Sequence, residues 1–224
     1  MTHSIKPLLS VLLLGIAFVS CKKDLLNENS VLQNAAGNKV ADHPNKLNSY
    51  YPFRDKSITN YLDSTIDGKL ATSKSTLLIL GDTTMDGNVY SKVSTDGSGS
   101  VTYINDNNGV TTLISFKGDD KITATFLKEN EPVGAVWKDE FLNAGVPSTY
   151  EWKMMAKGIN RTVQGVLYKD VIQVHLLGYA TLPVQGKVIF ANSEYYYAPD
   201  IGLIENIAVN PKTGKTELHR VLKG

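Results

Sequence analysis

The chain after Tyr50 consists of short runs of apolar and β-branched residues that are separated by turn residues. Five such runs in the first half are rich in the residue types that strands favour: 75–80, 89–93, 101–104, 110–116 and 121–127. In the last of these, Ile122, Ala124 and Phe126 alternate with threonines. That alternation predicts a strand with one face in the core and one in water.

Turn dipeptides lie between these runs. They are Asp86 with Gly87, Asp96 with Gly97, and Asn108 with Gly109. Asp-Gly and Asn-Gly pairs favour the positive φ angles of tight hairpin turns, so adjacent runs are expected to pair antiparallel. The pattern predicts a meander.

The second half continues with longer runs at 149–156, 161–179, 187–197 and 216–222. Residues 171–177 form the strongest predicted strand, with Ile172, Val174 and Leu176 on one face and a mixed second face. Pro211 and Gly214 mark a turn before the final strand. Only residues 138–144 hint at a helix, and that segment is too short to anchor a fold. Without a repeat or βαβ alternation, a parallel nucleotide-binding sheet is not expected.

The N-terminus carries Lys6, an apolar run over residues 8–19, Ser20 and then Cys21. This arrangement resembles the lipobox of bacterial lipoproteins, although Phe18 stands where leucine is usual. The resemblance implies cleavage before Cys21, a diacylglycerol on its thiol and an acylated new amine. A membrane span would need roughly 20 apolar residues, more than this run has. A leader cleaved elsewhere would leave a free thiol in an exported protein.

We therefore expect a signal peptide over residues 1–20, a flexible tether over 21–49 that is rich in Asn, Lys and Asp, and one β domain over 50–224. Lys22, Lys23 and Asp24 fit either a surface-export signal of Bacteroidota lipoproteins or a tether that is simply hydrophilic. Cys21 is the only cysteine, so the domain must fold without a disulfide within the chain.

Charge excludes one class of partner. Lys6 is the only Lys, Arg, Asp or Glu among residues 1–20, so the rest of the chain keeps 22 basic and 22 acidic side chains. A neutral chain without a block of like charges offers no electrostatic footprint for nucleic acid. We expect no nucleic-acid partner.

Four segments carry a further resemblance: Tyr51 to Phe53, Asp86 to Tyr90, Val166 to Val174 and Tyr195 to Glu205. They resemble motifs of a loose group of uncharacterised envelope lipoproteins of the Bacteroidota type. Here Asp200 replaces the usual glycine, and the tryptophan that often follows the first motif is absent. The resemblance implies one strongly curved antiparallel sheet, similar to the half-barrels of lipoprotein carriers. It also implies a concave apolar surface able to hold a lipid or acyl chain.

Candidate chemistry is sparse. His43 lies in the expected tether, and His175 and His219 lie in predicted strands without a carboxylate at helical or loop spacing. The acidic turns at 82–87 and 105–109 could suggest calcium, but hairpin turns explain them equally well. No hydrolase elbow, zinc-protease motif or phosphate loop occurs. We therefore expect no catalytic residue, no metal, no cofactor and no enzyme activity.

Tyr195, Tyr196 and Tyr197 form the densest aromatic cluster. Together with Trp152 they could line a groove for a carbohydrate or lipid, because such rings combine an apolar face with a polar tip. Alternatively, alternate tyrosines face the core and the solvent of a single strand.

These patterns predict a mainly β, non-enzymatic protein of the cell envelope, anchored by lipid at Cys21 and residing in the outer membrane. Its expected partners are the membrane and an apolar ligand or lipid on the curved sheet. A structural or interaction subunit of an envelope complex is the alternative. A divergent hydrolase of surface glycans is a third reading, for which no paired carboxylates stand out.

Overall fold

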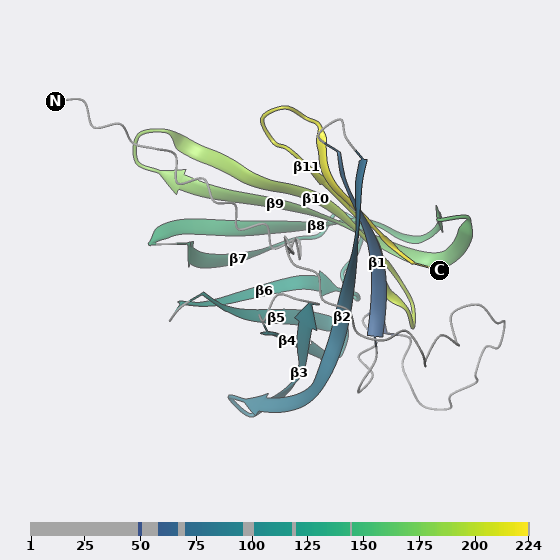
Figure 1. Ribbon diagram of the computed structural model, residues 1–224. Helices are drawn as coiled ribbons and strands as arrows, with labels where there is room; N and C mark the ends of the chain where they lie inside the picture. Colours follow the sequence, from purple (N-terminus) through teal and green to yellow (C-terminus); the bar gives the residue numbers. More distant parts are fainter. Residues whose placement is uncertain are drawn as a thin grey trace, which may run out of the picture.

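A computed structural model describes residues 49–50, 58–66, 70–95, 101–117, 120–143 and 145–223 (Figure 1). The expected signal peptide, Cys21 and His43 lie outside the described residues, as does the expected tether except for Ser49. Within the described ranges, no helix has the length and apolar character needed to span a membrane.

All strands belong to one antiparallel sheet of twelve strands, in the order β6-β5-β4-β3-β2-β1-β12-β11-β10-β9-β8-β7. Each strand therefore pairs with the strand next to it in the sequence, with one exception. Strands β6 and β7 are the two edges of the sheet, and β1 pairs with β12 instead. The sheet curves until its two edge strands, β6 and β7, lie next to each other (Figure 1). The prediction of a mainly β, strongly curved antiparallel sheet is confirmed. The strands are β1 (Ile58–Ile66), β2 (Leu70–Met85), β3 (Asn88–Thr95), β4 (Val101–Asn107), β5 (Val110–Lys117), β6 (Asp120–Lys128), β7 (Val136–Asn143), β8 (Val146–Val163), β9 (Val166–Leu182), β10 (Gly186–Ala198), β11 (Gly202–Val209) and β12 (Thr216–Leu222).

Two of the predicted hairpin turns are present as expected. Asp86 and Gly87 have φ angles of 52° and 77°, and Asn108 and Gly109 have 53° and 79°. Two successive positive φ angles give the turn whose twist matches paired strands. The turn expected at Asp96 lies outside the described residues.

The helical hint over residues 138–144 is wrong. Residues 138–143 belong to β7, which pairs with β8 along its whole length, and residue 144 lies outside the described residues. Trp137 and Phe141 pack against the interior core, while Glu140 and Leu142 are exposed. This period of two suits a strand, and pairing with β8 outweighs the weak helix preference of such a short segment.

The predicted run over residues 161–179 is interrupted in the structure. Gln164 and Gly165, with φ angles of 51° and 79°, form a tight turn between β8 and β9. A glutamine is an uncommon residue in this position, which hid the turn from the sequence pattern. Strand β1 was not predicted either, because its polar residues interrupt the apolar run.

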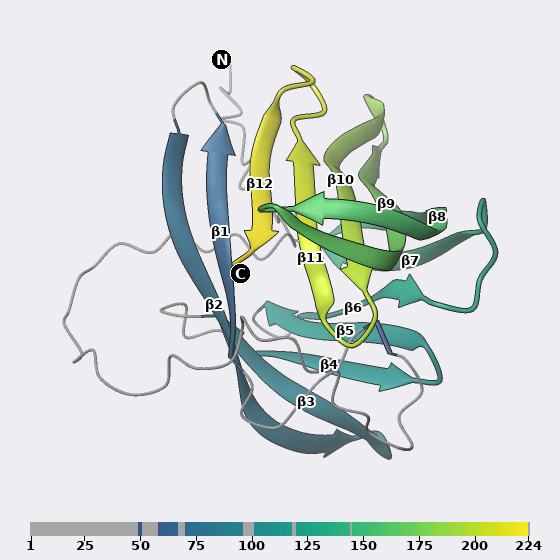
Figure 2. The ribbon, with the colours of Figure 1, turned by 90° about the vertical axis from the view of Figure 1, so that its right-hand side faces the viewer.

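Side chains pack on both faces of the sheet. The concave face holds the larger core, which draws buried side chains from nearly every strand. A smaller core lies on the outer face, where Val163, Tyr168 and Val171 of the β8–β9 hairpin cover Tyr196 and Ile204. Bulges in the β8–β9 pairing bend the hairpin, and it crosses in front of β10 and β11 (Figure 2).

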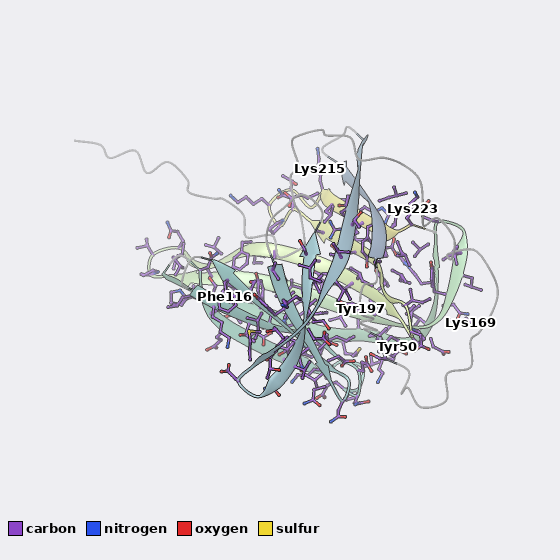
Figure 3. The ribbon with its side chains drawn as sticks, turned by 60° about the horizontal axis from the view of Figure 1, so that its bottom comes forward. Tyr50, Phe116, Lys169, Tyr197, Lys215 and Lys223 are labelled. Carbon is purple, nitrogen blue, oxygen red and sulfur yellow. The ribbon has the colours of Figure 1, made fainter. Side chains whose placement is uncertain are left out.

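The two ends of the curved sheet differ. We call the end with the β7–β8 and β9–β10 turns the rim end, and the opposite end, with the β4–β5 and β10–β11 turns, the strap end. Phe116 lies toward the rim end and Tyr50 at the strap end, with Tyr197 between them (Figure 3).

Ser49 and Tyr50, which we call the strap, are held at the strap end by four hydrogen bonds. Ser49 donates from its hydroxyl and accepts at its carbonyl oxygen, whereas Tyr50 donates from its backbone N–H and its phenol. The bond lengths are 2.7 Å to Asp106 Oδ2, 2.8 Å from Asp200 N, 2.7 Å to Glu129 Oε1 and 2.7 Å to the Asp170 carbonyl oxygen. The strap thereby joins β4, β9 and two turns.

Candidate functional site

A continuous row of aromatic rings runs through the interior core. Successive ring centroids lie 4.5–6.4 Å apart, which is the usual spacing of interacting aromatic pairs. We call this set the aromatic row. In order, its members are Phe126, Tyr197, Tyr195, Trp152, Tyr150 and Phe141. The side chains come from β6, β7, β8 and β10, so the curvature of the sheet brings them together.

Three of the four residues predicted for a ligand groove lie in this row. Trp152, Tyr195 and Tyr197 are 4%, 7% and 2% exposed, so their side chains are buried in the core on the concave face. Tyr196 lies on the other face, where the Arg161 guanidinium stacks 4.1 Å from its ring centroid. Tyr195 and Tyr197 face the interior core and Tyr196 faces outward, as the period of two of a strand predicts. The β8–β9 hairpin covers Tyr196, so it is buried as well.

Sequence reasoning missed Tyr150, Phe141 and Phe126 as members of the row. Their residue types gave no separate signal, because contact between β7, β8 and β10 depends on strand register. The helical interpretation of residues 138–144 also hid the inward direction of Phe141. Trp152 and Tyr195 were placed in one candidate groove only because both side chains are aromatic.

Tyr150 is the central anomaly of the row. Its side chain is 1% exposed, and its hydroxyl has no hydrogen-bond partner within the described part of the chain. By contrast, Tyr61 donates to the Leu203 carbonyl oxygen, and Tyr195 bonds with Ser193. Burial raises the pKa of Tyr150 well above its ordinary value. A buried hydroxyl without a partner is costly and calls for an explanation.

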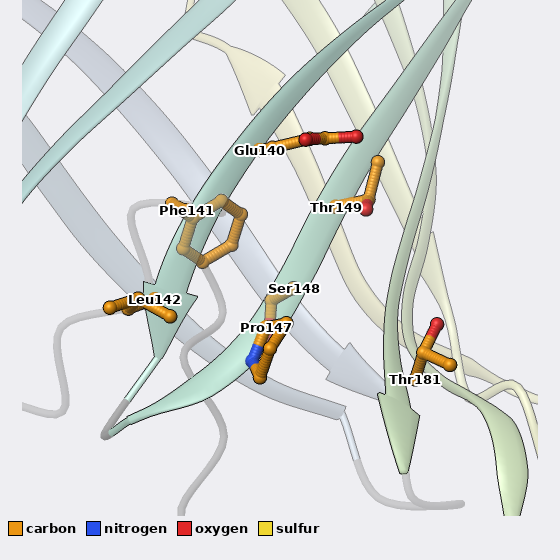
Figure 4. Close-up of a pocket in the computed structure, with 7 residues that line it drawn as sticks. All are labelled: Glu140, Phe141, Leu142, Pro147, Ser148, Thr149 and Thr181. Atoms are coloured by element: carbon orange, nitrogen blue, oxygen red, sulfur yellow. The ribbon is translucent and has the colours of Figure 1, made fainter. Parts of the chain in front are cut away.

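A depression of about 450 Å³ opens at the rim end, next to the row (Figure 4). We call it the rim depression. Phe141 belongs to both features, since its ring centroid lies 4.5 Å from that of Tyr150. The lining is mixed in polarity and consists of Glu140, Phe141, Leu142, Pro147, Ser148, Thr149 and Thr181.

The contact between β6 and β7, which we call the seam, is made by side chains. Asp139 Oδ2 accepts hydrogen bonds from the backbone N–H of Thr125 at 2.8 Å and from the indole N–H of Trp152 at 3.0 Å. The indole N–H of Trp137 donates to the Thr125 carbonyl oxygen at 2.5 Å. Burial raises the pKa of Asp139, and the hydrogen bonds it accepts act in the opposite direction.

A buried ion pair lies elsewhere on the concave face. Arg220, 2% exposed, bonds both carboxylate oxygens of Asp63 at 2.6 and 2.7 Å. The Arg220 guanidinium also lies 5.6 Å from the ring centroid of Tyr61. Two parallel bonds satisfy both charges, as burial requires. The pair links β1 to β12, which are distant in sequence.

The predicted histidines lie on the outer face. His219 Nε2 is 2.7 Å from Glu205 Oε1, and Arg161 Nε donates to the other Glu205 oxygen at 2.6 Å. His175 Nε2 is 2.8 Å from Asn192 Oδ1. Among the described residues, no group of three or more histidine, cysteine, aspartate or glutamate side chains could hold a metal ion.

The two acidic turns have protein partners. Asp82 accepts a hydrogen bond from Ser91, and Asp86 pairs with Lys121 at an exposed position. Asp106, in the second turn region, accepts the bond from the strap. Hairpin geometry therefore accounts for these residues.

Comparisons with known proteins found two similar crystal structures. A candidate exported protein with a YmcC-like fold from Bacteroides fragilis covers 79% of this chain and 98% of its own, with 11% identity and a TM-score of 0.40. A candidate lipoprotein from Parabacteroides distasonis covers 80% and 98%, with 10% identity and a TM-score of 0.45. No model of a protein family matches, and no curated protein matches significantly.

Both neighbours belong to the kind of protein that the N-terminal sequence and the short motifs predict. Likenesses of this size carry no argument about function. The fold assignment rests on the sheet of this chain itself.

Proposed function

We propose that the chain is an exported, lipid-anchored protein of the cell envelope that binds an apolar ligand without catalysing a reaction. The ligand has a polar group and occupies the interior near Tyr150. The observation that carries this proposal is the buried Tyr150 hydroxyl, for which the described residues supply no partner. A ligand that bonds it would recover part of the roughly 1–3 kcal/mol that such a group costs.

The surroundings of Tyr150 support an apolar ligand. Its ring lies among Phe141, Trp152 and Phe190, at centroid distances of 4.5, 6.1 and 6.0 Å. Sites for small ligands are mostly apolar with a few polar groups that fix orientation. Phe141 also links this region to the rim depression, where the molecule is open to solvent.

The charged side chains near the interior support a binding role over catalysis. Asp63 is neutralised by Arg220, and Asp139 accepts two hydrogen bonds that join strands. Each of these carboxylates holds the fold together, which leaves the aromatic rings and the Tyr150 hydroxyl as the groups facing a ligand.

Native mass spectrometry tests the ligand half of the proposal. The chain from residue 21 onward with Cys21→Ser is mixed with palmitic acid, and a one-to-one complex is expected. Tyr150→Phe keeps the ring and removes the hydroxyl, so it should bind roughly two- to tenfold more weakly, as the loss of one hydrogen bond predicts. The absence of any complex with the Tyr150-containing protein would overturn the proposal.

The second candidate function is that of an interaction subunit, favoured by apolar side chains exposed toward the rim end. Phe116, Leu142 and Val184 are 51%, 56% and 91% exposed. Such side chains can mark a docking surface when they are grouped. Crosslinking in intact cells should capture one reproducible partner with the unaltered chain and lose it with Leu142→Arg plus Val184→Arg. Equal capture by both proteins would count against this role.

A further inference from the structure

The seam is the only place around the curved sheet where adjacent described strands share no backbone ladder. Every other neighbouring pair, from β6–β5 round to β8–β7, is joined by paired residues. At the seam, both backbone groups of Thr125 are instead bonded by side chains of β7, namely Asp139 and Trp137.

We infer that β7 is a movable edge strand and that the seam is the entrance through which an apolar ligand reaches the aromatic row. This inference rests on the proposed function, because it names the route to that same site.

The first argument is the small number of bonds that opening would break. Separating β7 from β6 loses the bonds of Asp139 and Trp137 to Thr125 and the contact of the Lys128 ammonium with the Trp137 ring, while the β7–β8 ladder is kept. Opening between any other two strands would break a ladder of backbone bonds. Proteins open locally most readily where the fewest hydrogen bonds and contacts must break.

The second argument is the direction of the β7 side chains. Trp137, Asp139 and Phe141 occupy alternate positions, and Trp137 and Phe141 pack against the interior core. Phe141 touches Tyr150, and Asp139 holds the indole of Trp152. A displacement of β7 away from β6 would therefore uncover Tyr150 and Trp152 together, which are the two central members of the row.

The seam also indicates the class of ligand. Trp137, Trp152 and Phe141 line the route with apolar surface, while the Asp139 carboxylate lies beside it. A carboxylate at the entrance repels an anionic group and tolerates a hydrocarbon chain. We therefore expect an acyl chain to enter with its apolar end first.

A disulfide across the seam tests this route. In the Cys21→Ser background, which has no other cysteine, Thr125→Cys and Asp139→Cys place two thiols where the native side chains already touch. The oxidised protein and the same protein after reduction form a matched pair. Palmitic acid uptake is followed through Trp137 and Trp152, the only tryptophans, by stopped-flow fluorescence.

We expect uptake by the oxidised protein to be slower by about tenfold or more than by the reduced protein, because the entrance is closed. Equal rates in the two states would overturn the inference while leaving the proposed function intact. Absence of binding by both the reduced protein and the parent chain would instead overturn the proposed function and, with it, the route.

Hydrogen exchange on the chain with Cys21→Ser alone gives a second test that does not depend on the disulfide. The amide of Thr125, which donates across the seam to Asp139, should exchange faster than the ladder amides of β9 and β10, and palmitic acid should slow its exchange. Protection of the Thr125 amide equal to that of β9 and β10 would contradict a movable edge. This readout judges the seam even if the cysteine variant does not fold.

Discussion

Gly178, on β9, lies where even one added carbon atom would collide with its neighbours. A Cβ at this position would be 2.8 Å from Phe190 Cε2, 2.9 Å from Ala191 Cβ and 3.2 Å from Tyr150 Cε1. We expect Gly178→Ala to lower the free energy of unfolding by about 1–3 kcal/mol, the usual cost of overpacking a core. Urea denaturation measures the change.

Phe190→Leu supplies the matched control for this prediction. In the double variant, removal of the aromatic ring should recover part of the stability lost in Gly178→Ala. An unchanged stability of the single variant would mean that β9 and β10 can separate at this point without cost.

Asp139 gives a prediction of pH dependence. Burial raises its pKa above the ordinary value of 3.8, while hydrogen bonds from Thr125 and Trp152 and the charge of Lys128 lower it. The folded state therefore keeps the proton to higher pH than the unfolded chain does. It follows that this group lowers the free energy of unfolding as the pH rises above 3.8 through the folded pKa.

Asp139→Asn cannot titrate, so we expect it to lack this contribution. Urea unfolding at a series of pH values should show a smaller decline for the variant than for the parent above pH 3.8. Asp82→Asn, at an exposed position, controls for the loss of a carboxylate. Equal pH dependence in Asp139→Asn and the parent would contradict the raised pKa.

At the scale of residues, the sequence predicted alternation well and contacts poorly. The inward direction of Ile172, Val174 and Leu176 follows from the period of a strand, and all three are buried. Tyr150 and Asp139 could not be found, because their importance arises from neighbours on other strands. No spacing rule places a carboxylate of one edge strand against a backbone amide of the other.

Among the elements, the β8–β9 hairpin depends on a few contacts for its position over the outer face. Arg161 bonds Glu205, stacks on Tyr196 and lies opposite Tyr168 in the pairing of β8 with β9. We expect Arg161→Ala to speed hydrogen exchange in the hairpin tip, with a much smaller effect on β2 and β3.

Lys153→Ala, also on β8 and exposed, is the matched control and should leave exchange in the tip unchanged. Mass spectrometry of peptides from residues 157–171 measures both variants. An Arg161→Ala protein with parental exchange in this segment would show that apolar packing alone holds the hairpin in place.

The sequence predicted most elements of the sheet, apart from their ends. The final run over residues 216–222 coincides with β12, and Asp86 and Asn108 begin the expected turns. The errors have physical causes. Strand β7 is fixed by pairing with β8, and the Gln164 turn adopts positive φ without a favoured residue type.

For the molecule as a whole, three buried tyrosines predict the response to alkali. Burial raises the pKa of Tyr61, Tyr150 and Tyr195 above the ordinary 10.0, to about 12 for Tyr195. Unfolded phenols ionise at the ordinary value, so ionisation favours unfolding once the pH exceeds 10. We expect stability to fall between about pH 10 and 12.

Phenolate absorbance and circular dichroism, recorded on the same samples, test this expectation. The last tyrosines to ionise should do so together with the loss of the β signal. Tyr195→Phe should weaken the dependence on pH in this range. Smooth ionisation of all eleven tyrosines near pH 10 with an unchanged β signal would contradict it.

The strap determines how a pulling force on the N-terminal side of the domain is distributed over the sheet. Any tension that arrives through the backbone enters at Ser49 and Tyr50, whose bonds reach β4, β9 and the turns that follow β6 and β10. The load is thus divided among four places in the sheet and does not peel off a single edge strand. A protein held to a surface by its N-terminus would in this way take up drag at the strap end, away from the rim depression at the opposite end of the sheet.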